Sequence, residues 1–258
     1  MKYLSNLAPC VIGTLLALAF ALSMATNDNF GWYVISPTTE QGANNLRFLL
    51  DGYSATISVS LLAIVGSMTI GLGIALPGLS ENRCARALNR GYVEIFRSIP
   101  MLVMLLWVYY GLPVLLDINL DVFAAGVIAL ALCDSPFQAE IFRAGIQSIA
   151  KGQHEAADTL GLSYADKMRY VILPQAIRRV LPPLGNQFVY ILKMSSLVSV
   201  IGMTDLTRRA NELVVSEYRA LEIYSFLVLE YMVLVLIASW LVRRLERAMG
   251  SDERLASV

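Results

Sequence analysis

Three ionisable residues stand inside long apolar stretches of the sequence: Asp134, Lys193 and Glu230. A charge within a membrane span is costly, so such residues usually face the interior of a helix bundle. They could bind a polar solute on its way across a membrane. They could also pair with one another or with backbone groups and only lock the helices together. The residues alone leave both interpretations open.

A zwitterionic amino acid needs an anionic group near its ammonium and hydrogen-bond donors near its carboxylate. Asp134 could supply the anion. Ser195, Ser196 and backbone N–H groups freed near Pro136 could supply the donors, because proline interrupts helical hydrogen bonding. Lys193 is interpreted as structural.

The sequence contains no catalytic or metal-binding set. Cys10, Cys84 and Cys133 lie far apart, which favours packing roles over a metal site or a disulfide framework. The single histidine, His154, cannot form a metal site alone. There is no G-x-x-x-x-G-K-S/T phosphate loop. We therefore expect no cofactor and no enzymatic activity, and the energy for any active transport must come from another subunit.

The composition is that of a chain solvated by lipid. Of the 258 residues, 57% are hydrophobic and 16% are charged, with a mean hydropathy of +0.60. The net charge is zero, which gives no indication of nucleic-acid binding. A membrane helix needs about 20 mostly apolar residues. Six stretches qualify, at about 7–26, 54–77, 100–116 (or from somewhat earlier), 122–140, 181–203 and 223–242.

The first of these stretches has a second interpretation. Lys2, an apolar run and the small residues Ser23, Met24 and Ala25 also have the pattern of a cleavable signal peptide. We favour a retained helix, since the later spans need no cleaved leader to insert.

The Lys and Arg residues predict the orientation, because basic residues concentrate on the cytoplasmic side. With both termini inside, fifteen of the twenty basic residues lie in cytoplasmic segments and four lie outside. Polar residues 27–46 are typical of an external loop with turn signals. We therefore expect a multi-pass protein of the bacterial inner membrane, with its N- and C-termini in the cytoplasm.

The cytoplasmic segment at 143–179 is too long for a simple turn between spans. Glu155–Leu160 can form a short helix, and Gly161 can end it, since glycine readily adopts the left-handed cap conformation. Ser163 and Asp166 match a capping box, which predicts the start of a second short helix.

A proline limits this second helix. Pro174 cannot donate a backbone hydrogen bond, and it biases Leu173 away from helical geometry. We therefore predict two short helices at an angle, held at the membrane surface. Such an elbow could dock into a groove on a partner, or it could only cap the bundle.

The same segment resembles a known motif. Gly152-Gln153-His154-Glu155-Ala156-Ala157, followed by Gly161, is similar to the EAA loop of binding-protein-dependent ABC importers. The family pattern continues with Ile-x-Leu-Pro, and Val171-Ile172-Leu173-Pro174 stands at the matching distance. The resemblance implies a coupling helix that inserts into an ATP-binding subunit. The coupling residues that it implies are Gly152, Glu155, Ala156, Ala157, Gly161 and Pro174.

More of the chain resembles the polar amino acid branch of these permeases. The similar segments are 92–97 with Pro100, 139–143, 173–176, 182–186 and 196–202. Two departures concern the solute site: relatives often have an acid at the position of Met194 and a neutral residue at that of Asp134. The candidate substrate-binding residues are therefore Asp134, Ser135, Met194, Ser195 and Ser196.

The resemblance implies an all-α polytopic membrane protein with the type I ABC importer permease fold, here with six transmembrane helices and a cytoplasmic coupling-helix loop. It predicts an N-terminal extra helix and periplasmic loop at 1–50, a permease domain at 51–250 and a cytoplasmic tail at 251–258. The implied partners are ATP-binding cassette ATPase subunits, a second permease subunit (identical or a sister chain), a periplasmic solute-binding protein, the amino acid substrate and membrane lipid, without nucleic acid.

Two other functions stay open from the residues alone. A channel or secondary transporter without an ATPase would need an ion pathway, for which the intramembrane charges are few. A membrane-embedded assembly or sensor protein would have no transport role.

Overall fold

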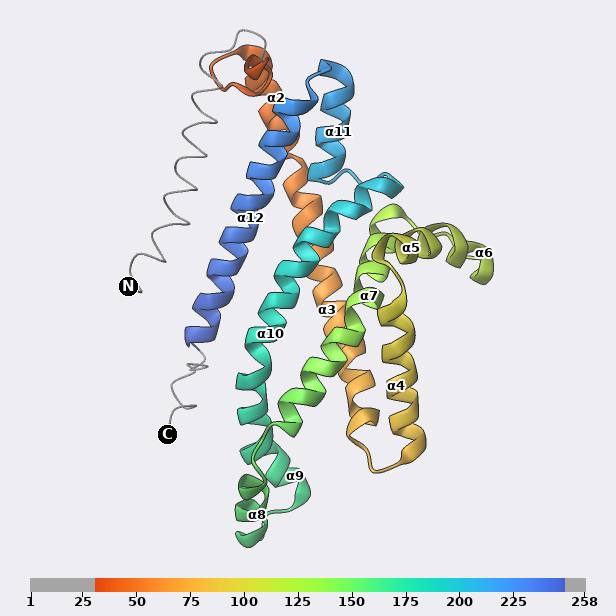
Figure 1. Cartoon of the computed structure of the whole chain (residues 1–258), viewed down its shortest axis with the longest axis vertical. Helices are drawn as coiled ribbons and strands as arrows, with labels where there is room; N and C mark the ends of the chain where they lie inside the picture. Colours follow the sequence, from red (N-terminus) through yellow and green to blue (C-terminus); the bar gives the residue numbers. More distant parts are fainter. Residues whose placement is uncertain (1–30, 249–258) are drawn as a thin grey trace, which may run out of the picture.

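The computed structural model describes residues 31–248, and every regular element in that range is a helix (Figure 1). From the N-terminal side these are η1 (Trp32–Ile35), α2 (Glu40–Leu50), α3 (Gly52–Leu79), α4 (Arg83–Ser98), α5 (Met101–Leu106), η2 (Trp107–Gly111), α6 (Leu112–Leu116) and α7 (Val122–Gln147). They are followed by α8 (Lys151–Thr159), α9 (Tyr164–Asp166), η3 (Lys167–Ile172), α10 (Leu173–Met194), η4 (Ser195–Ile201), α11 (Leu206–Glu217) and α12 (Ala220–Ala248).

Four helical segments are long and apolar enough to cross a membrane: Glu40–Leu79, Val122–Gln147, Tyr164–Ile201 and Ala220–Ala248. A fifth candidate is the bent pair of α4 with α5–α6. The predictions of an all-α fold and of spans near 54–77, 122–140, 181–203 and 223–242 are confirmed within the described range. The predicted first span, 7–26, lies outside the described residues.

The predicted span at 100–116 reaches the length of a span only with the earlier start that the sequence left open, and it is bent. The helical stretch Met101–Leu116 leaves α4 at a bend of 97° and projects sideways from the bundle (Figure 1). The bend lies at Pro100, which lacks the N–H needed to extend α4. Ile99 is accordingly extended, with φ −88° and ψ 122°. Only together do α4 and α5–α6 reach the length and apolarity of a span.

Small residues allow α3 and α7 to pack closely at the centre of the bundle. Ala63, Ser67, Gly71 and Ala75 recur every four residues on α3, and all four are buried. A Cβ at Gly71 would lie only 2.4 Å from the Cβ of Gln138 on α7. Small residues at this spacing let membrane helices approach and gain dispersion contacts. This contact positions Asp134, which projects from the middle of α7.

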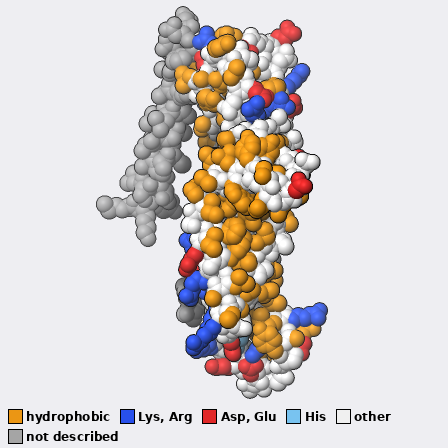
Figure 2. All heavy atoms as spheres, turned by 90° about the vertical axis from the view of Figure 1, so that its right-hand side faces the viewer, with side chains coloured by type: hydrophobic (Ala, Val, Ile, Leu, Met, Phe, Trp, Pro, Cys, Tyr) orange, Lys and Arg blue, Asp and Glu red, His pale blue; other side chains and the backbone are white. Residues whose placement is uncertain are grey.

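The surface is divided as expected for a chain in a bilayer. Figure 2 shows apolar side chains covering the middle of one face, with charged side chains gathered toward the two ends. On α12, the exposed residues include Val228, Met232, Leu236, Leu241 and Trp240. The apolar middle therefore suits contact with lipid.

The end of the bundle opposite α8 is covered by η1, α2 and α11 (Figure 1). The expectation of a loop throughout 27–46 is wrong for its last part, because α2 begins at Glu40. The Thr39 hydroxyl accepts a hydrogen bond from the N–H of Gly42 at 3.1 Å, which caps the helix. The Asn45 amide donates to Glu217 Oε1 at 3.1 Å and so joins α2 to α11.

Candidate functional site

A helical elbow lies at one end of the bundle, between α7 and α10 (Figure 1). Its first arm, α8, begins at Lys151, which is four residues earlier than predicted, and ends at Thr159, with Gly161 in the predicted cap position just after it. Gly161 has φ +71°, the left-handed region that glycine tolerates best. The N–H of Gly161 donates to the carbonyl of Asp158 at 3.0 Å, and that of Leu162 donates to the carbonyl of Ala157 at 3.2 Å. This pair of bonds is a Schellman cap.

The second arm starts with the predicted cap. The Ser163 hydroxyl accepts from the backbone N–H of Asp166 at 3.2 Å and donates to the Asp166 carboxylate at 2.6 Å. The arm includes α9 and the π-helical segment η3, and it then continues into α10.

The predicted break before Pro174 is wrong. Leu173 is helical, with φ −60° and ψ −42°. The wider π-helical turn at Lys167–Ile172 directly precedes the proline, where a normal α-helix would lack its N–H donor. The helical segment Tyr164–Ile201 therefore runs from the elbow into the membrane as one span.

Polar and apolar contacts hold the two arms together. The Lys167 Nζ lies 2.6 Å from the Asp158 Oδ1, and the Gln175 amide donates to the Gln153 Oε1 at 3.1 Å. Beneath them, buried Ile149, Ile172 and Ala176 form an apolar cluster. The elbow is therefore a packed unit rather than a loose loop.

The elbow exposes most of the residues that resemble the coupling motif. Gly152, Glu155 and Ala156 are exposed, whereas Ala157 is buried. Two large side chains beside them, Leu160 and Tyr164, are 78% and 76% exposed. Exposed apolar side chains next to a carboxylate on a rigid convex unit are typical of a protein-docking surface.

Asp134 lies in the middle of α7 and is only 1% exposed. Its Oδ2 accepts hydrogen bonds from the Ser67 hydroxyl and the Gln138 amide, each at 2.7 Å. Its Oδ1 accepts from the Gln187 amide at 2.9 Å. Asp134 therefore links α3, α7 and α10 through neutral donors. The sequence analysis did not single out Gln187. A polar amide side chain within an apolar span could have indicated its role.

The other substrate candidates occupy two separate places. Ser135 is buried and its hydroxyl lies 2.7 Å from that of Tyr92 on α4. The hydroxyls of Ser195 and Ser196 donate to backbone carbonyls one turn earlier, and Met194 packs against the main apolar core. Within the described range, no hydrogen bond joins Asp134 to the serines at the α10–η4 junction.

The three intramembrane charges do not pair with one another. Lys193 is exposed and lines a cavity of about 380 Å³ with Ser196, Thr207 and Tyr231 among others. Glu230 is 4% exposed, and its carboxylate oxygens have no hydrogen-bond partner among residues 31–248. Mutual ion pairing is therefore not what locks these helices. For Asp134, neutral side chains provide the contacts.

The comparison with protein families assigns this architecture. Residues 67–251 match the family described as "Binding-protein-dependent transport system inner membrane component". The chain belongs to this family. It is therefore a multi-pass inner-membrane permease, and the predicted resemblance to ABC importer permeases is confirmed.

Related proteins cover nearly the whole permease. It is 37% identical over 221 residues to the glutamine transport system permease protein GlnP of Escherichia coli (strain K12), which covers 85% of this chain and 98% of the relative. It is 35% identical over 208 residues to the arginine transport system permease protein ArtQ of Bacillus subtilis (strain 168). The match covers 81% of this chain and 95% of ArtQ.

Solved structures agree with the fold. The permease matches a chain from the "Crystal structure of an amino acid ABC transporter with histidines" with a TM-score of 0.74 and 41% identity, over 80% of this chain and 96% of that one. A chain of the MetNI methionine ABC transporter is 21% identical and has a TM-score of 0.67. This match covers 80% of the present chain and 97% of the MetNI chain. The permease has the type I importer fold, and in such importers ATP is hydrolysed by separate subunits.

Proposed function

We propose that this permease moves a polar amino acid or a related solute into the cell, driven by ATPase subunits that bind the elbow. The observation that carries this proposal is the exposed surface of Glu155, Ala156, Leu160 and Tyr164 on an elbow whose second arm continues into α10. The names of the relatives support an amino acid as substrate, because they include permeases for glutamine and for arginine.

The coupling mechanism follows from the rigidity of the elbow. ATP binding draws two ATPase subunits together, and their motion reaches the membrane through Gly152, Glu155, Ala156 and the segment up to Gly161. Because the second arm continues through Pro174 into α10, the force rotates a whole span. Alternating access then results from two packings of the same helices, biased from one end.

The assembly proposed here has two permease subunits, identical or sister chains, with the elbow and both termini in the cytoplasm. A solute-binding protein delivers substrate to the opposite end, where η1, α2 and α11 lie. The excess of Lys and Arg on the elbow side supports this orientation. The division into residues 1–50, 51–250 and 251–258 belongs to the same proposal.

The proposed solute site lies near Asp134, Ser135 and the α10–η4 junction with Met194, Ser195 and Ser196. The hydrogen bonds of Asp134 also tie three helices together. The carboxylate can exchange a neutral donor for the ammonium of a solute when the helices move apart. Asp134 then both senses the solute and holds the empty site closed.

The first test is isolation of the affinity-tagged permease from its native membrane. The wild type should co-purify with an ATPase, and Glu155→Lys should lose it, because reversed charge on the docking surface opposes binding. Glu81→Lys is the matched control, since Glu81 is exposed at the same end but lies in the α3–α4 turn. Uptake that persists in membranes without any ATPase would instead support a channel or secondary transporter.

The second test is uptake of a panel of labelled amino acids by cells with and without the gene. Uptake of at least one amino acid should fall when the gene is deleted. Unchanged uptake across the panel would favour an assembly or sensor role and would contradict the proposal.

A further inference from the structure

A charged cavity of about 400 Å³ lies between α4 and the last turns of α7, which lead to the elbow. It is lined by four arginines and two glutamates together with four uncharged residues: Arg86, Arg90, Arg97, Arg143, Glu94, Glu140, Gly78, Asn89, Val93 and Gln147. Neither Asp134 nor the α10–η4 junction contributes to it. The cavity is therefore distinct from the solute site proposed above.

Part of this charge is already neutralised. Arg143 binds Glu140 through two contacts, of 2.7 Å and 3.3 Å, and donates to Gln147 at 3.1 Å. Arg86 donates to the backbone carbonyls of Ser80 and Glu81, so it caps the end of α3.

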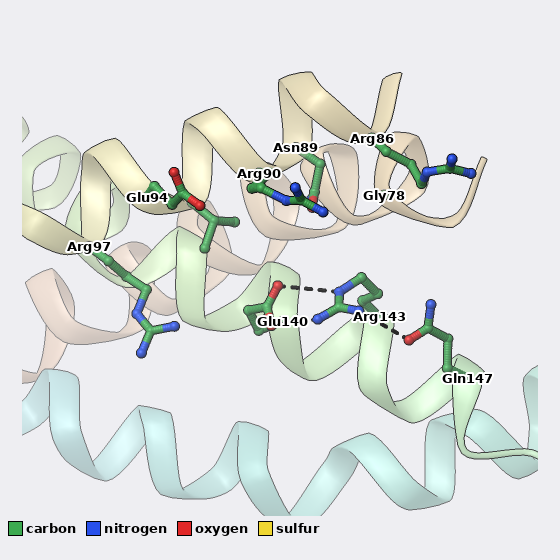
Figure 3. Close-up of a pocket in the computed structure, with 10 residues that line it drawn as sticks. Gly78, Arg86, Asn89, Arg90, Glu94, Arg97, Glu140, Arg143 and Gln147 are labelled. Carbon is green, nitrogen blue, oxygen red and sulfur yellow. Dashed lines mark hydrogen bonds and ion pairs between the residues drawn. The ribbon is translucent and has the colours of Figure 1, made fainter. Parts of the chain in front are cut away.

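Other charged groups in the cavity have no ionic partner among the described residues. Arg97 lies over the ring of Phe137, with its guanidinium carbon 5.1 Å from the ring centre. Arg90 and Glu94 make no hydrogen bond or ion pair with another residue in the range 31–248. Arg90 from α4 and Arg143 from α7 extend into the same space (Figure 3). The cavity thus holds an unpaired guanidinium, that of Arg90, and an unpaired carboxylate, that of Glu94, beside the Arg143–Glu140 ion pair. This set of charges is electrostatically suited to a ligand that carries both a negative and a positive group.

Helix α4 has an apolar face and a charged face, and the charged face lines the cavity. Leu88 and Ile95 are 65% and 60% exposed, and they lie about half a turn around the helix from Arg90 and Arg97. In a membrane helix the apolar face meets lipid or another helix, and the charged face meets protein interior or water. The face of α4 that lines the cavity is therefore the one suited to water or protein, and the opposite face is the one suited to acyl chains.

From these contacts we infer that the α4–α7 cavity is a second amino acid site, which holds the solute on the cytoplasmic side before release. Arg90 binds the carboxylate, which Arg143 can contact while it keeps Glu140, and Glu94 binds the ammonium. Both groups are common to all α-amino acids, so this site recognises the class and not the side chain. The inference rests on the proposed function, since it takes the elbow end to be cytoplasmic and the solute to be an amino acid.

The test is binding to the permease purified with its ATPase partner in nanodiscs of phosphatidylcholine and phosphatidylglycerol, measured by saturation-transfer NMR. The probes are glutamine, glutamine methyl ester and N-acetylglutamine. Glutamine should bind, and each derivative should bind at least about tenfold more weakly, because each lacks one of the two charges. Equal binding of all three probes would overturn the inference.

Two variants assign the binding to this cavity. Arg90→Gln and Glu94→Gln should each weaken glutamine binding about tenfold or more. Arg83→Gln is the control, because Arg83 is exposed on α4 but does not line the cavity. Wild-type affinity in both cavity variants would overturn the inference. If these variants still co-purify with the ATPase, the proposed function stands whatever becomes of the second site.

A phospholipid headgroup with phosphate and ammonium groups has the same charges. Nanodiscs with added phosphatidylethanolamine separate the two sources. The amino acid site predicts unchanged glutamine binding in these nanodiscs. Loss of glutamine binding, with phosphatidylethanolamine retained by the wild type and released by Arg90→Gln, would identify the headgroup as occupant and contradict the inference.

Discussion

Lys167 and Asp158 meet with 2.6 Å between Nζ and Oδ1, and this contact joins the two arms of the elbow across the Gly161 turn. The lysine side chain is 14% exposed and the aspartate 58% exposed. Because the aspartate is largely in solvent, the pair contributes less than about 1 kcal/mol to the free energy of unfolding. Its expected role is to fix the angle between α8 and η3.

Lys167→Met should therefore change coupling more than stability. We expect the melting temperature of the purified permease to stay within a few degrees of wild type, on the order of what 1 kcal/mol shifts in a domain of this size. Solute taken up per ATP hydrolysed should fall several-fold in proteoliposomes. An unchanged ratio of solute taken up to ATP hydrolysed would show that coupling does not need the Lys167–Asp158 contact.

Two glycines of α3 offer a matched test of the α3–α7 contact. Gly71→Ala should destabilise the permease by about 1–3 kcal/mol, because its Cβ would lie 2.4 Å from the Cβ of Gln138. Gly73→Ala should be neutral or slightly stabilising, since no atom lies within 4 Å of its Cβ position. Unfolding in detergent measures both. Equal stability of the two variants would contradict the close approach of these helices.

Substitutions at Asp134 separate its two proposed roles. Asp134→Leu leaves the donors of Ser67, Gln138 and Gln187 without an acceptor, and it should lower stability by about 2–5 kcal/mol. Asp134→Asn retains one acceptor oxygen and should cost less. If Asp134 binds the solute ammonium, Asp134→Asn abolishes uptake in spite of its milder effect on unfolding. Normal uptake in that variant would leave Asp134 with a structural role alone.

The buried carboxyl group of Asp205 should make the stability of the permease depend on pH. It follows the Tyr164–Ile201 span, caps α11 by accepting from the N–H of Arg208 at 2.9 Å, and is fully buried. Burial raises the pKa of Asp205 to about 6, so between about pH 4 and that value the folded chain binds more protons than the unfolded chain. Its contribution to stability is present at low pH and is lost as the pH rises through about 6.

The measurement is the melting temperature of wild type and Asp205→Asn between pH 4 and pH 7. The difference between them should change across this range and level off above pH 6, because only the wild type titrates at this position. The asparagine keeps an acceptor for the Arg208 N–H, so the cap itself is preserved. A constant difference across the whole range would contradict a raised pKa.

Local chemistry in the sequence was sufficient to predict much of the elbow. Gly161 and Ser163 act through contacts within a few residues, and both capping predictions are confirmed. Pro174 was misjudged for a physical reason. Its missing N–H predicts a break, but a π-helical turn before it lets the helix continue.

The bend between α4 and α5 and the contacts of Asp134 could not be predicted from local sequence patterns. By composition the arginines of α4 predict a loop. In the structure this segment is a helix packed against α3 and α7, and together with α5–α6 it has the length and apolarity of a candidate span. Gln187 lies 53 residues from Asp134 in sequence, so only the packing of α7 against α10 brings them together.

The most direct test of the elbow as the force-receiving element is photo-crosslinking from position 156 in intact membranes. A photoreactive phenylalanine derivative replaces Ala156, which is exposed beside Glu155 on α8. We predict one main adduct, which contains the nucleotide-hydrolysing subunit and whose yield changes when ATP is added. An adduct with the solute-binding protein, or labelling of this position by a reagent confined to the periplasm, would contradict the account.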